Sequence, residues 1–386
     1  MTLDGLISDR GLRVVLETVV SIRRKASVGR VARIKGGAGS AGAESRALAG
    51  REGLAVDFDR WYRREALAAF KEAGAPGLLF LGFETAVLDL GVAGSGHLTN
   101  LVREMGLQPS DIVISIRESK VEDIAVLKDF VARHRGQGFL IALMDLGVGH
   151  SNLERVSLLR PDILKVGEGL VAELEKEFFA QEILKSLATL SKKIGALVVA
   201  EGVSTEAQAL AALDNGVDML EGSFFSHEGV AQRIDDLAAR HKTVSLEKSK
   251  ALQKRVRESE SLLSSMVRAL AGLSTSEFDK TLARLIQENA TVECLFVLNE
   301  EGQQKSETHT RPGVAFKQNA LFHPARPGAD HSMKEYVYLL SDSFVNRYRT
   351  EPYVSQASGN LCVTLSAIFR DAANKNHILC LDIPWG

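Results

Sequence analysis

Cysteine is scarce in this chain of 386 residues, and its three copies, Cys294, Cys362 and Cys380, all lie in the last quarter. Their spacing matches neither a CxxC metal clip nor an even-numbered disulfide framework, so we expect buried free thiols. The nine histidines form no HxH or HxxxH pair, which argues against a zinc enzyme. The sequence therefore predicts neither a bound metal nor another cofactor.

Long apolar runs and a strong excess of either charge are also missing. No run reaches the roughly 18 apolar residues that cross a bilayer. The apolar stretch 14–22 is interrupted by Glu17 and precedes no cleavage pattern, so we expect no signal peptide and a cytoplasmic location. The formal net charge is only -2, which provides no general attraction for nucleic acid or an anionic membrane. Any nucleotide would need a local pocket.

The residues that are abundant indicate a folded protein of two domains, since 45% are hydrophobic and 25% are charged. Short β-rich runs alternate with amphipathic segments such as 121–135 and 180–193. This alternation favours a parallel α/β architecture, and eight runs fit a TIM-like (β/α)8 barrel. The predicted strands are 12–22, 28–35, 77–83, 111–118, 138–146, 162–167, 196–203 and 218–225.

Three regions are predicted along the chain: a barrel over 1–235, a helical linker over 236–275 and an α+β domain over 276–386. The Gly/Ala/Ser-rich stretch 36–50 has the composition of a flexible loop. In the last region, we expect a helix at 277–289, a strand, turn and second strand within 292–304, and a closing hairpin at 361–383.

The linker also carries a seam of alternating four- and three-residue spacings. This seam suits either a dimeric coiled coil or a connecting helix that packs on its own domains. Its positions are Leu252, Val256, Ser259, Leu263, Met266 and Leu270.

Four segments of the barrel region resemble, in order, motifs of the EAL-type cyclic di-GMP phosphodiesterases. They are ALMDLGVGHSNL, RPDILKVG, VVAEGVSTEAQ and GVDMLEGSFFS, and the resemblance covers roughly residues 10–230. It implies a barrel whose C-terminal mouth binds cyclic di-GMP, with acids that hold two divalent cations and activate a water.

Several acidic motif positions of that family carry other residues here. Val31 stands for the signature Glu, Gly82 for Asn, Ser115 for Glu, Met144 for the first of two Asp, and Gly167 for a further Asp. Mg²⁺ requires hard oxygen ligands, which neither a thioether nor an alkyl side chain supplies. We therefore predict no phosphodiesterase turnover, no catalytic residues and no metal site.

Five remnants of the family's mouth persist, namely Lys35, Glu118, Asp145, Lys165 and Glu201. They form either a residual active site or, as we favour, an ion network that keeps buried charges paired. Lys35 replaces a phosphate-binding Arg and offers a point charge in place of a bidentate fork. Glu17 and Glu221 replace Gln, and we expect these acids to repel a dinucleotide. Binding of cyclic di-GMP is therefore doubtful on the sequence.

Residues from about 290 onward resemble PAS-like and Cache-like sensory domains, through ECLFVLNEEGQQ, DHSMKEYVYLL, YRTEPYVSQASGNLCVTLSAIFRD and ILCLDI. The resemblance implies a central antiparallel sheet facing a small-molecule pocket. An acid and a base facing aromatic rings would suit a zwitterion or a carboxylate. Alternatively, the tyrosines are core residues and the acid caps a strand end. The candidate pocket residues are Lys334, Tyr336, Tyr353, Thr364 and Asp382.

The sequence thus predicts a non-catalytic bacterial signalling protein. Its degenerate barrel would bind a protein partner, and its C-terminal domain would sense a small molecule or form a homodimer. Two alternatives stay open, a cyclic di-GMP receptor without hydrolysis and an active phosphodiesterase. A barrel enzyme of unrelated chemistry is a remote further reading, because fold does not fix function.

Overall fold

The computed structural model describes residues 2–36, 42–74, 76–90, 94–117, 124–147, 153–226, 229–314, 317, 319, 321–341 and 345–385. The chain forms two compact units, Met1–Glu247 and Lys248–Gly386. Among the described helices, none combines the length and the apolar character that crossing a membrane requires.

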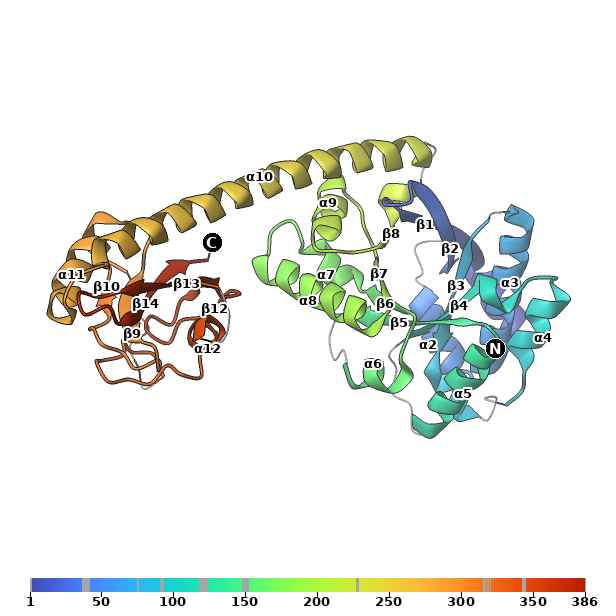
Figure 1. The fold of residues 1–386 in the computed structure, drawn as a ribbon. Helices are drawn as coiled ribbons and strands as arrows, with labels where there is room; N and C mark the ends of the chain where they lie inside the picture. The colour runs from blue at the N-terminus through green and yellow to red at the C-terminus, as the bar shows by residue number, and fades with distance from the viewer. Residues whose placement is uncertain are drawn as a thin grey trace. The chain divides into compact units, whose positions relative to one another are not determined.

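Eight strands close into a barrel in the first unit (Figure 1), as the alternation of strands and helices predicts. Strands β2 to β8 run parallel to one another, whereas β1 runs antiparallel to both of its neighbours, β2 and β8. The predicted parallel architecture is therefore confirmed for β2 to β8, and β1 departs from it. Only residues 22–25 connect β1 to β2, and a parallel pair needs a crossover of a dozen or more residues. The strands are β1 Arg13–Ser21, β2 Ala26–Lys35, β3 Leu78–Glu84, β4 Ile112–Arg117, β5 Leu140–Leu146, β6 Ile163–Val166, β7 Leu197–Ala200 and β8 Met219–Glu221.

Helices surround the barrel (Figure 1). Helix α8 buries Ala180, Leu184, Ala188 and Ser191, a spacing that places one face against the strands. The two predicted helices correspond to α5 and α8, while residues 121–123 lie outside the described part. The helices are α1 Leu3–Arg10, α2 Gly42–Arg51, α3 Ala55–Ala73, α4 His97–Glu104, α5 Ile124–Gly136, α6 Leu153–Leu159, α7 Glu168–Ala172, α8 Phe178–Ile194 and α9 Glu206–Asp214, with short 3₁₀ turns η2 Thr85–Leu90, η3 Pro109–Asp111 and η4 Ser223–Phe225.

The predicted loop at 36–50 is wrong over its described part, because 42–51 form helix α2. Alanine favours helix strongly, and small residues let this helix approach β2 closely. Ser45 and Ala49 are buried, and a Cβ on Gly42 would come to 3.0 Å from the Cβ of Ile34. Residues 37–41 lie outside the described part of the chain.

One apolar residue from each strand fills the barrel interior, namely Val19, Val31, Phe80, Val113, Ala142, Ile163, Val199 and Met219. Side chains alternate along a strand, so the residues two positions nearer the mouth face the interior in the next layer. On β2 to β8 that layer is Arg33, Gly82, Ser115, Met144, Lys165, Glu201 and Glu221, and on the reversed β1 it is Glu17. The layer is charged on the side of β6, β7, β8, β1 and β2, and uncharged on the side of β3, β4 and β5.

A single helix of 41 residues, α10 Val230–Leu270, covers most of the predicted linker at 236–275 and begins six residues before it. The predicted seam divides along it. Leu263, Met266 and Leu270 are buried in the core of the second unit, whereas Leu252 is half exposed. The C-terminal part of the seam thus packs on its own domain, as the connecting-helix interpretation requires.

The second unit has an antiparallel sheet in the order β10-β9-β14-β13-β11, with β12 beside β13. The predicted helix at 277–289 is confirmed as α11, and the predicted hairpin is confirmed as β13 and β14, paired from Cys362 opposite Pro384 to Arg370 opposite Asn376. The second strand expected after the first turn is reduced to one bridge between Leu298 and Gln304. The elements are η5 Thr275–Glu277, α11 Phe278–Glu288, β9 Cys294–Asn299, β10 His309–Thr310, α12 Glu335–Ser341, β11 Arg347–Arg349, β12 Tyr353–Val354, β13 Leu361–Arg370 and β14 Asn376–Pro384.

The two faces of this sheet pack against different helices. Leu295, Val297 and Leu381 pack with residues of α10 and α11. On the opposite face, Phe296 and Cys380 pack with residues of α12. Asp382 follows Cys380 by two positions on β14 and therefore faces the α12 side.

Candidate functional site

A buried ion cluster occupies the C-terminal mouth of the barrel. The Nζ of Lys165 lies 2.6 Å from Oε1 of Glu201 and 3.0 Å from Oε2 of Glu221. All three side chains are at most 5% exposed. The same Nζ lies 5.5 Å from the centroid of the Phe80 ring in the apolar layer below. The cation therefore pairs with both carboxylates and also contacts an aromatic face.

Glycine follows each of the two buried glutamates, and the backbone there requires it. Gly202 has a φ of +73°, and a Cβ on it would come to 2.4 Å from Cγ of Glu168. Gly222 has a φ of +150°, and a Cβ on it would come to 2.2 Å from the carbonyl oxygen of Val203. Only glycine accommodates these backbone angles and close contacts. The two glycines therefore fix the backbone at the ends of β7 and β8, where Glu201 and Glu221 lie at the mouth.

Arg33 links this cluster to the surface. One of its Nη atoms lies 2.5 Å from Oε1 of Glu221 and 3.7 Å from Oε1 of Glu201. Its Nε lies 3.5 Å from Oε2 of Glu17, whose Oε1 lies 2.8 Å from Nζ of Lys35. The sequence prediction treated Glu17 and Glu221 as uncompensated acids, and this is corrected, because protein cations pair with both. The sequence signal for Arg33 is its position two residues after Val31 in β2, which places it on the inward face.

Burial and pairing shift the pKa values of these groups in opposite directions. Burial raises the pKa of Glu221 to about 7, with Lys165 acting against the rise. Burial also acts to raise the pKa of Glu201, but the positive charges of Lys165 and Arg33 outweigh it and lower that pKa. Burial acts to lower the pKa of Lys165, and the two glutamates raise it overall. Lys165 and Glu201 thus stay charged at neutral pH, while Glu221 titrates near it.

A second set of charges forms the rim on the β3 to β5 side. Nε of Arg117 lies 3.2 Å from Oε1 of Glu84, and Nη1 of Arg117 lies 3.8 Å from Oδ2 of Asp145. Asp145 has a φ of +59°, a left-handed conformation that aspartate tolerates better than most residues. Among the described residues, no group of three or more His, Cys, Asp and Glu side chains is placed to hold a metal ion. Glu118, a predicted remnant, lies outside the described residues.

A cavity of about 490 Å³ opens beside this rim, between α2, α3 and β3. Its walls are largely apolar, with Phe58, Ala86 and Leu90 among them. Two arginines stand at its polar end, where Arg117 and Arg46 lie 3.2 and 3.9 Å from Glu84. Arg46 also stacks over the ring of Tyr62, 5.1 Å from its centroid. An apolar slot with cations at one end suits a flat ligand that carries negative charge.

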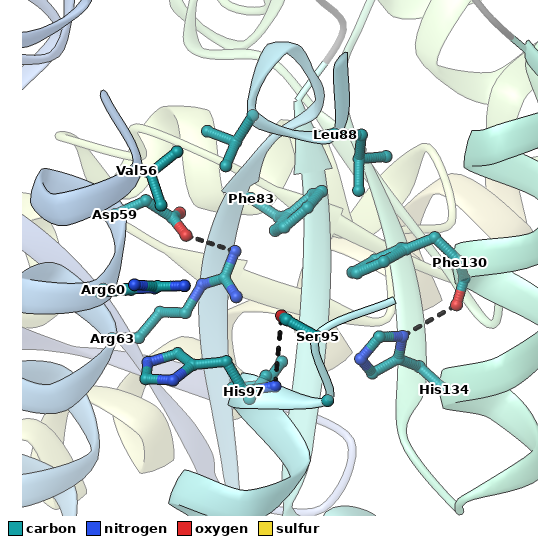
Figure 2. A pocket seen from close by; sticks show the side chains of 13 residues that line it. Val56, Asp59, Arg60, Arg63, Phe83, Leu88, Ser95, His97, Phe130 and His134 are labelled. Atoms are coloured by element: carbon teal, nitrogen blue, oxygen red, sulfur yellow. Dashed lines mark hydrogen bonds and ion pairs between the residues drawn. The ribbon is translucent and has the colours of Figure 1, made fainter. Parts of the chain in front are cut away.

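A much smaller cavity, of about 20 Å³, lies on a neighbouring face of α3 and shares Asp59 and Val87 with the first (Figure 2). Arg63 points across it, with Nη2 2.5 Å from Oδ2 of Asp59 and the guanidinium 4.8 Å from the Phe83 centroid. In Figure 2, His134 lies across the cavity from Arg63, whereas His97 lies on the same side as Arg63. This volume holds about one water molecule, so we assign the Asp59–Arg63 pair to packing of α3.

In the second unit, a cavity of about 260 Å³ brings together four of the five predicted pocket residues. Lys334, Tyr336, Tyr353 and Asp382 line it. Thr364 does not line it, but its Oγ1 donates to Oδ1 of Asp382 at 2.7 Å and lies 2.6 Å from the hydroxyl of Tyr353. The predicted residues therefore share one site, with Thr364 holding the acid and the phenol from behind.

Comparison with known proteins identifies the first unit. The EAL domain matches residues 2–228, more than half of the chain. The chain belongs to the EAL-domain family. The uncharacterised EAL-domain protein YkuI of Bacillus subtilis is 26% identical over 301 residues, which cover 73% of this chain and 71% of YkuI. The uncharacterised protein Rv1354c of Mycobacterium tuberculosis is 30% identical over 178 residues, which cover 45% of this chain and 29% of that protein.

Solved structures agree with this fold. The crystal structure of B. subtilis YkuI, in complex with substrate c-di-GMP and calcium, superposes with a TM-score of 0.80 at 22% identity, and covers 100% of this chain and 99% of that one. The calcium and cyclic di-GMP complex of Klebsiella pneumoniae BlrP1 gives a TM-score of 0.52 at 24% identity, and covers 57% of this chain and 56% of that one. The first likeness extends beyond the barrel to the arrangement within the second unit.

The five residues that the sequence predicts to stand at lost ligand positions provide few ligand atoms in the structure. Val31 belongs to the apolar layer, and Met144 is 3% exposed. Ser115 is buried, and its Oγ has no hydrogen-bond partner among the described residues. The backbone N–H of Gly82 donates to the hydroxyl of Tyr62. Gly167 precedes α7 with no side chain at the cap. On the β3 to β5 side, this layer of the mouth thus has no side chain at Gly82, one hydroxyl at Ser115 and a thioether at Met144.

Proposed function

We propose that this EAL-domain protein is a signalling protein whose barrel does not hydrolyse cyclic di-GMP. One observation carries this proposal: Lys165 and Arg33 pair with Glu201 and Glu221 inside the mouth. Two-metal hydrolysis needs carboxylates that clamp cations around the attacking and leaving oxygens. Here two cations of the protein are already paired with these carboxylates. At the positions where further metal ligands would be needed, the chain has Val31, Gly82, Ser115 and Met144.

On this proposal, the degenerate barrel acts through binding. It presents a surface to a protein partner in a cytoplasmic signalling pathway, while the second unit is a PAS-like or Cache-like module that senses a small molecule or joins two copies of the chain. The central antiparallel sheet and the 260 Å³ cavity on its α12 side support the sensory role. Helix α10 belongs to both units. It couples them if the helix can adopt two conformations and if each unit shifts the equilibrium between these conformations.

A second candidate function is that of a cyclic di-GMP receptor without hydrolysis. The structure of YkuI is a complex with cyclic di-GMP, and three features of this mouth favour the same ligand. Glu17 is paired with Lys35 and Arg33 and so repels phosphate less. Lys35 is 54% exposed, and beside its pair with Glu17 its ammonium has further N–H groups that a phosphate can accept from. The 490 Å³ slot beside Arg117 would accept a purine ring.

A calorimetric titration with cyclic di-GMP, with and without Mg²⁺, tests both functions. For the receptor, we expect the same affinity in either buffer, because paired carboxylates leave no role for the cation. Lys35→Ala should weaken binding by about tenfold, the scale of one charged contact to phosphate. Lys193→Ala, at an exposed lysine of α8, is the matched control and should change nothing.

The other outcomes are equally informative. If cyclic di-GMP produces no heat at any concentration tested, the receptor function is excluded and the barrel retains the protein-binding role. If Mg²⁺ strengthens binding strongly, the mouth recruits metal, and the proposal of a non-catalytic barrel fails.

A further inference from the structure

The cavity of the second unit has a buried acid in its wall. Asp382 is 2% exposed and lies on β14 where the sheet faces α12. Its Oδ1 accepts a hydrogen bond from Thr364 and its Oδ2 accepts one from Ser355, at 2.7 and 2.9 Å. Two hydroxyl groups orient this carboxylate, but neither supplies a positive charge. A buried carboxylate normally has a cationic partner.

No cation of the described chain fills that role. Among the described residues, no lysine, arginine or histidine forms an ion pair with Asp382. The positive charge of Lys334 acts to lower the pKa of Asp382, but its Nζ donates to Oε1 of Gln356 at 3.0 Å and forms no ion pair with Asp382. His331 is held between the hydroxyl of Tyr336 and Oε1 of Gln304, and burial lowers its pKa, so it is neutral.

A second buried acid increases the negative potential. Glu293 precedes β9 and is 1% exposed, and its charge acts on Asp382. Asn360 donates to one carboxylate oxygen of Glu293, whereas the other has no hydrogen-bond partner among the described residues. Within the described part of the chain, neither acid forms an ion pair; the two lie at the same end of the sheet, and Asp382 lines the cavity.

The remaining walls suit a cation with an apolar body. Phe296, Tyr336 and Tyr353 contribute aromatic rings to the cavity, and such rings attract ammonium groups through their negative faces. The volume of about 260 Å³ is below the usual range of about 300 to 1,000 Å³ for drug-sized ligands. The cavity thus combines a buried negative charge, aromatic walls and limited room, and its lining also includes Lys334, which Gln356 holds.

We propose that this cavity binds a small organic ammonium ligand, whose nitrogen takes the place of the missing counter-ion of Asp382 beside the ring of Tyr353. This inference rests on the proposed sensory role of the second unit and specifies its ligand class. A bound ammonium would neutralise the buried carboxylate, donate to it directly and contact the aromatic face.

Calorimetry on the full chain at pH 8 tests this assignment with probes of one size and different charge. We would titrate butylamine, butanol, butyrate and 2-aminobutyrate, together with primary amines from methylamine to benzylamine. At least one amine, or the zwitterion, should bind at least tenfold more tightly than the alcohol and the carboxylate. Asp382→Asn should abolish this preference while keeping the size of the side chain. Glu301→Gln, at an exposed acid of the same unit, should leave it unchanged.

A second variant protects the test against misfolding of Asp382→Asn. Tyr353→Leu keeps the carboxylate and removes the aromatic face, and it should weaken the amine at least threefold. Preferential binding of butyrate would overturn the ammonium assignment and leave the sensory role intact. If none of the probes binds, both the ligand class and the small-molecule role are contradicted.

Discussion

Replacing Lys165 with methionine should lower the free energy of unfolding of the barrel by about 3–5 kcal/mol, the usual cost of removing one partner from a buried ion pair. Methionine has a similar length and leaves Glu201 and Glu221 facing each other with only the partly exposed Arg33 nearby. The loss should be smaller at pH 5.5 than at pH 8. At the lower pH, Glu221 is protonated, because burial raises its pKa to about 7.

The measurement needs a signal from the barrel alone, and the chain provides one. It has two tryptophans, Trp61 in α3 and Trp385 in the second unit. In a Trp385→Phe background, denaturant unfolding followed by Trp61 fluorescence reports the first unit. Lys193→Met on the exposed surface of α8 is the control and should cost less than about 0.5 kcal/mol.

The triple variant Lys165→Met, Glu201→Gln and Glu221→Gln distinguishes broken pairing from lost packing. Removing a whole buried ion set is often neutral or stabilising, so the triple variant should recover most of the loss. If Lys165→Met alone changes stability by less than about 1 kcal/mol, the ion cluster described at the mouth is not formed in solution.

Asp382→Asn should have a large effect of the opposite sign on the second unit. Burial raises the pKa of Asp382 from an ordinary value of 3.8 to about 6, with Thr364 and Ser355 acting against the rise. The folded state therefore binds a proton more tightly than the unfolded state. This contribution to stability is fully present below pH 3.8 and is lost as the pH rises through about 6. The difference between a pKa of 3.8 in the unfolded state and about 6 in the folded state corresponds to a loss of about 3 kcal/mol of folding stability at neutral pH.

Asparagine does not titrate, so the variant should exceed the wild type by up to about 3 kcal/mol at pH 7 and match it near pH 4. The hydroxyl of Ser355 or Thr364 can turn to accept from the new amide, which limits the cost of the substitution. Trp385 fluorescence in a Trp61→Phe background follows this unit. An advantage that does not vary between pH 4 and pH 7 would show that Asp382 keeps an ordinary pKa and is not buried as described.

The sequence predicts the barrel well because its signals are local. Eight β-rich runs and the glycines after Glu201 and Glu221 mark the strands and their ends. The antiparallel direction of β1 was not predicted, because the pattern of β-rich runs shows where strands lie but not how they run. The direction follows from the connection to β2, residues 22–25, which is too short for a parallel crossover. Helix α2 was missed because its glycine- and alanine-rich composition also suits a loop, and only packing against Ile34 and β2 decides between them.

The candidate sites were predicted less evenly. The motif series located Lys165 and Glu201, but the pairing of Glu201 with both Lys165 and Arg33 depends on strands far apart in the sequence, β2, β6 and the end of β7. In the second unit, Tyr353, Thr364 and Asp382 were predicted as one site and lie together. Their separation along the chain does not reveal that Thr364 stands behind Asp382, since this depends on the register of β13 opposite β14.

Turnover of cyclic di-GMP tests the central claim most directly. Pure protein would be incubated with cyclic di-GMP and either Mg²⁺ or Mn²⁺ at pH 8, beside an active EAL phosphodiesterase, and the linear dinucleotide product would be separated and quantified. With Lys165 and Arg33 holding the acids of the mouth, we predict no product above that of a sample without enzyme. Metal-dependent formation of the linear dinucleotide would contradict the account.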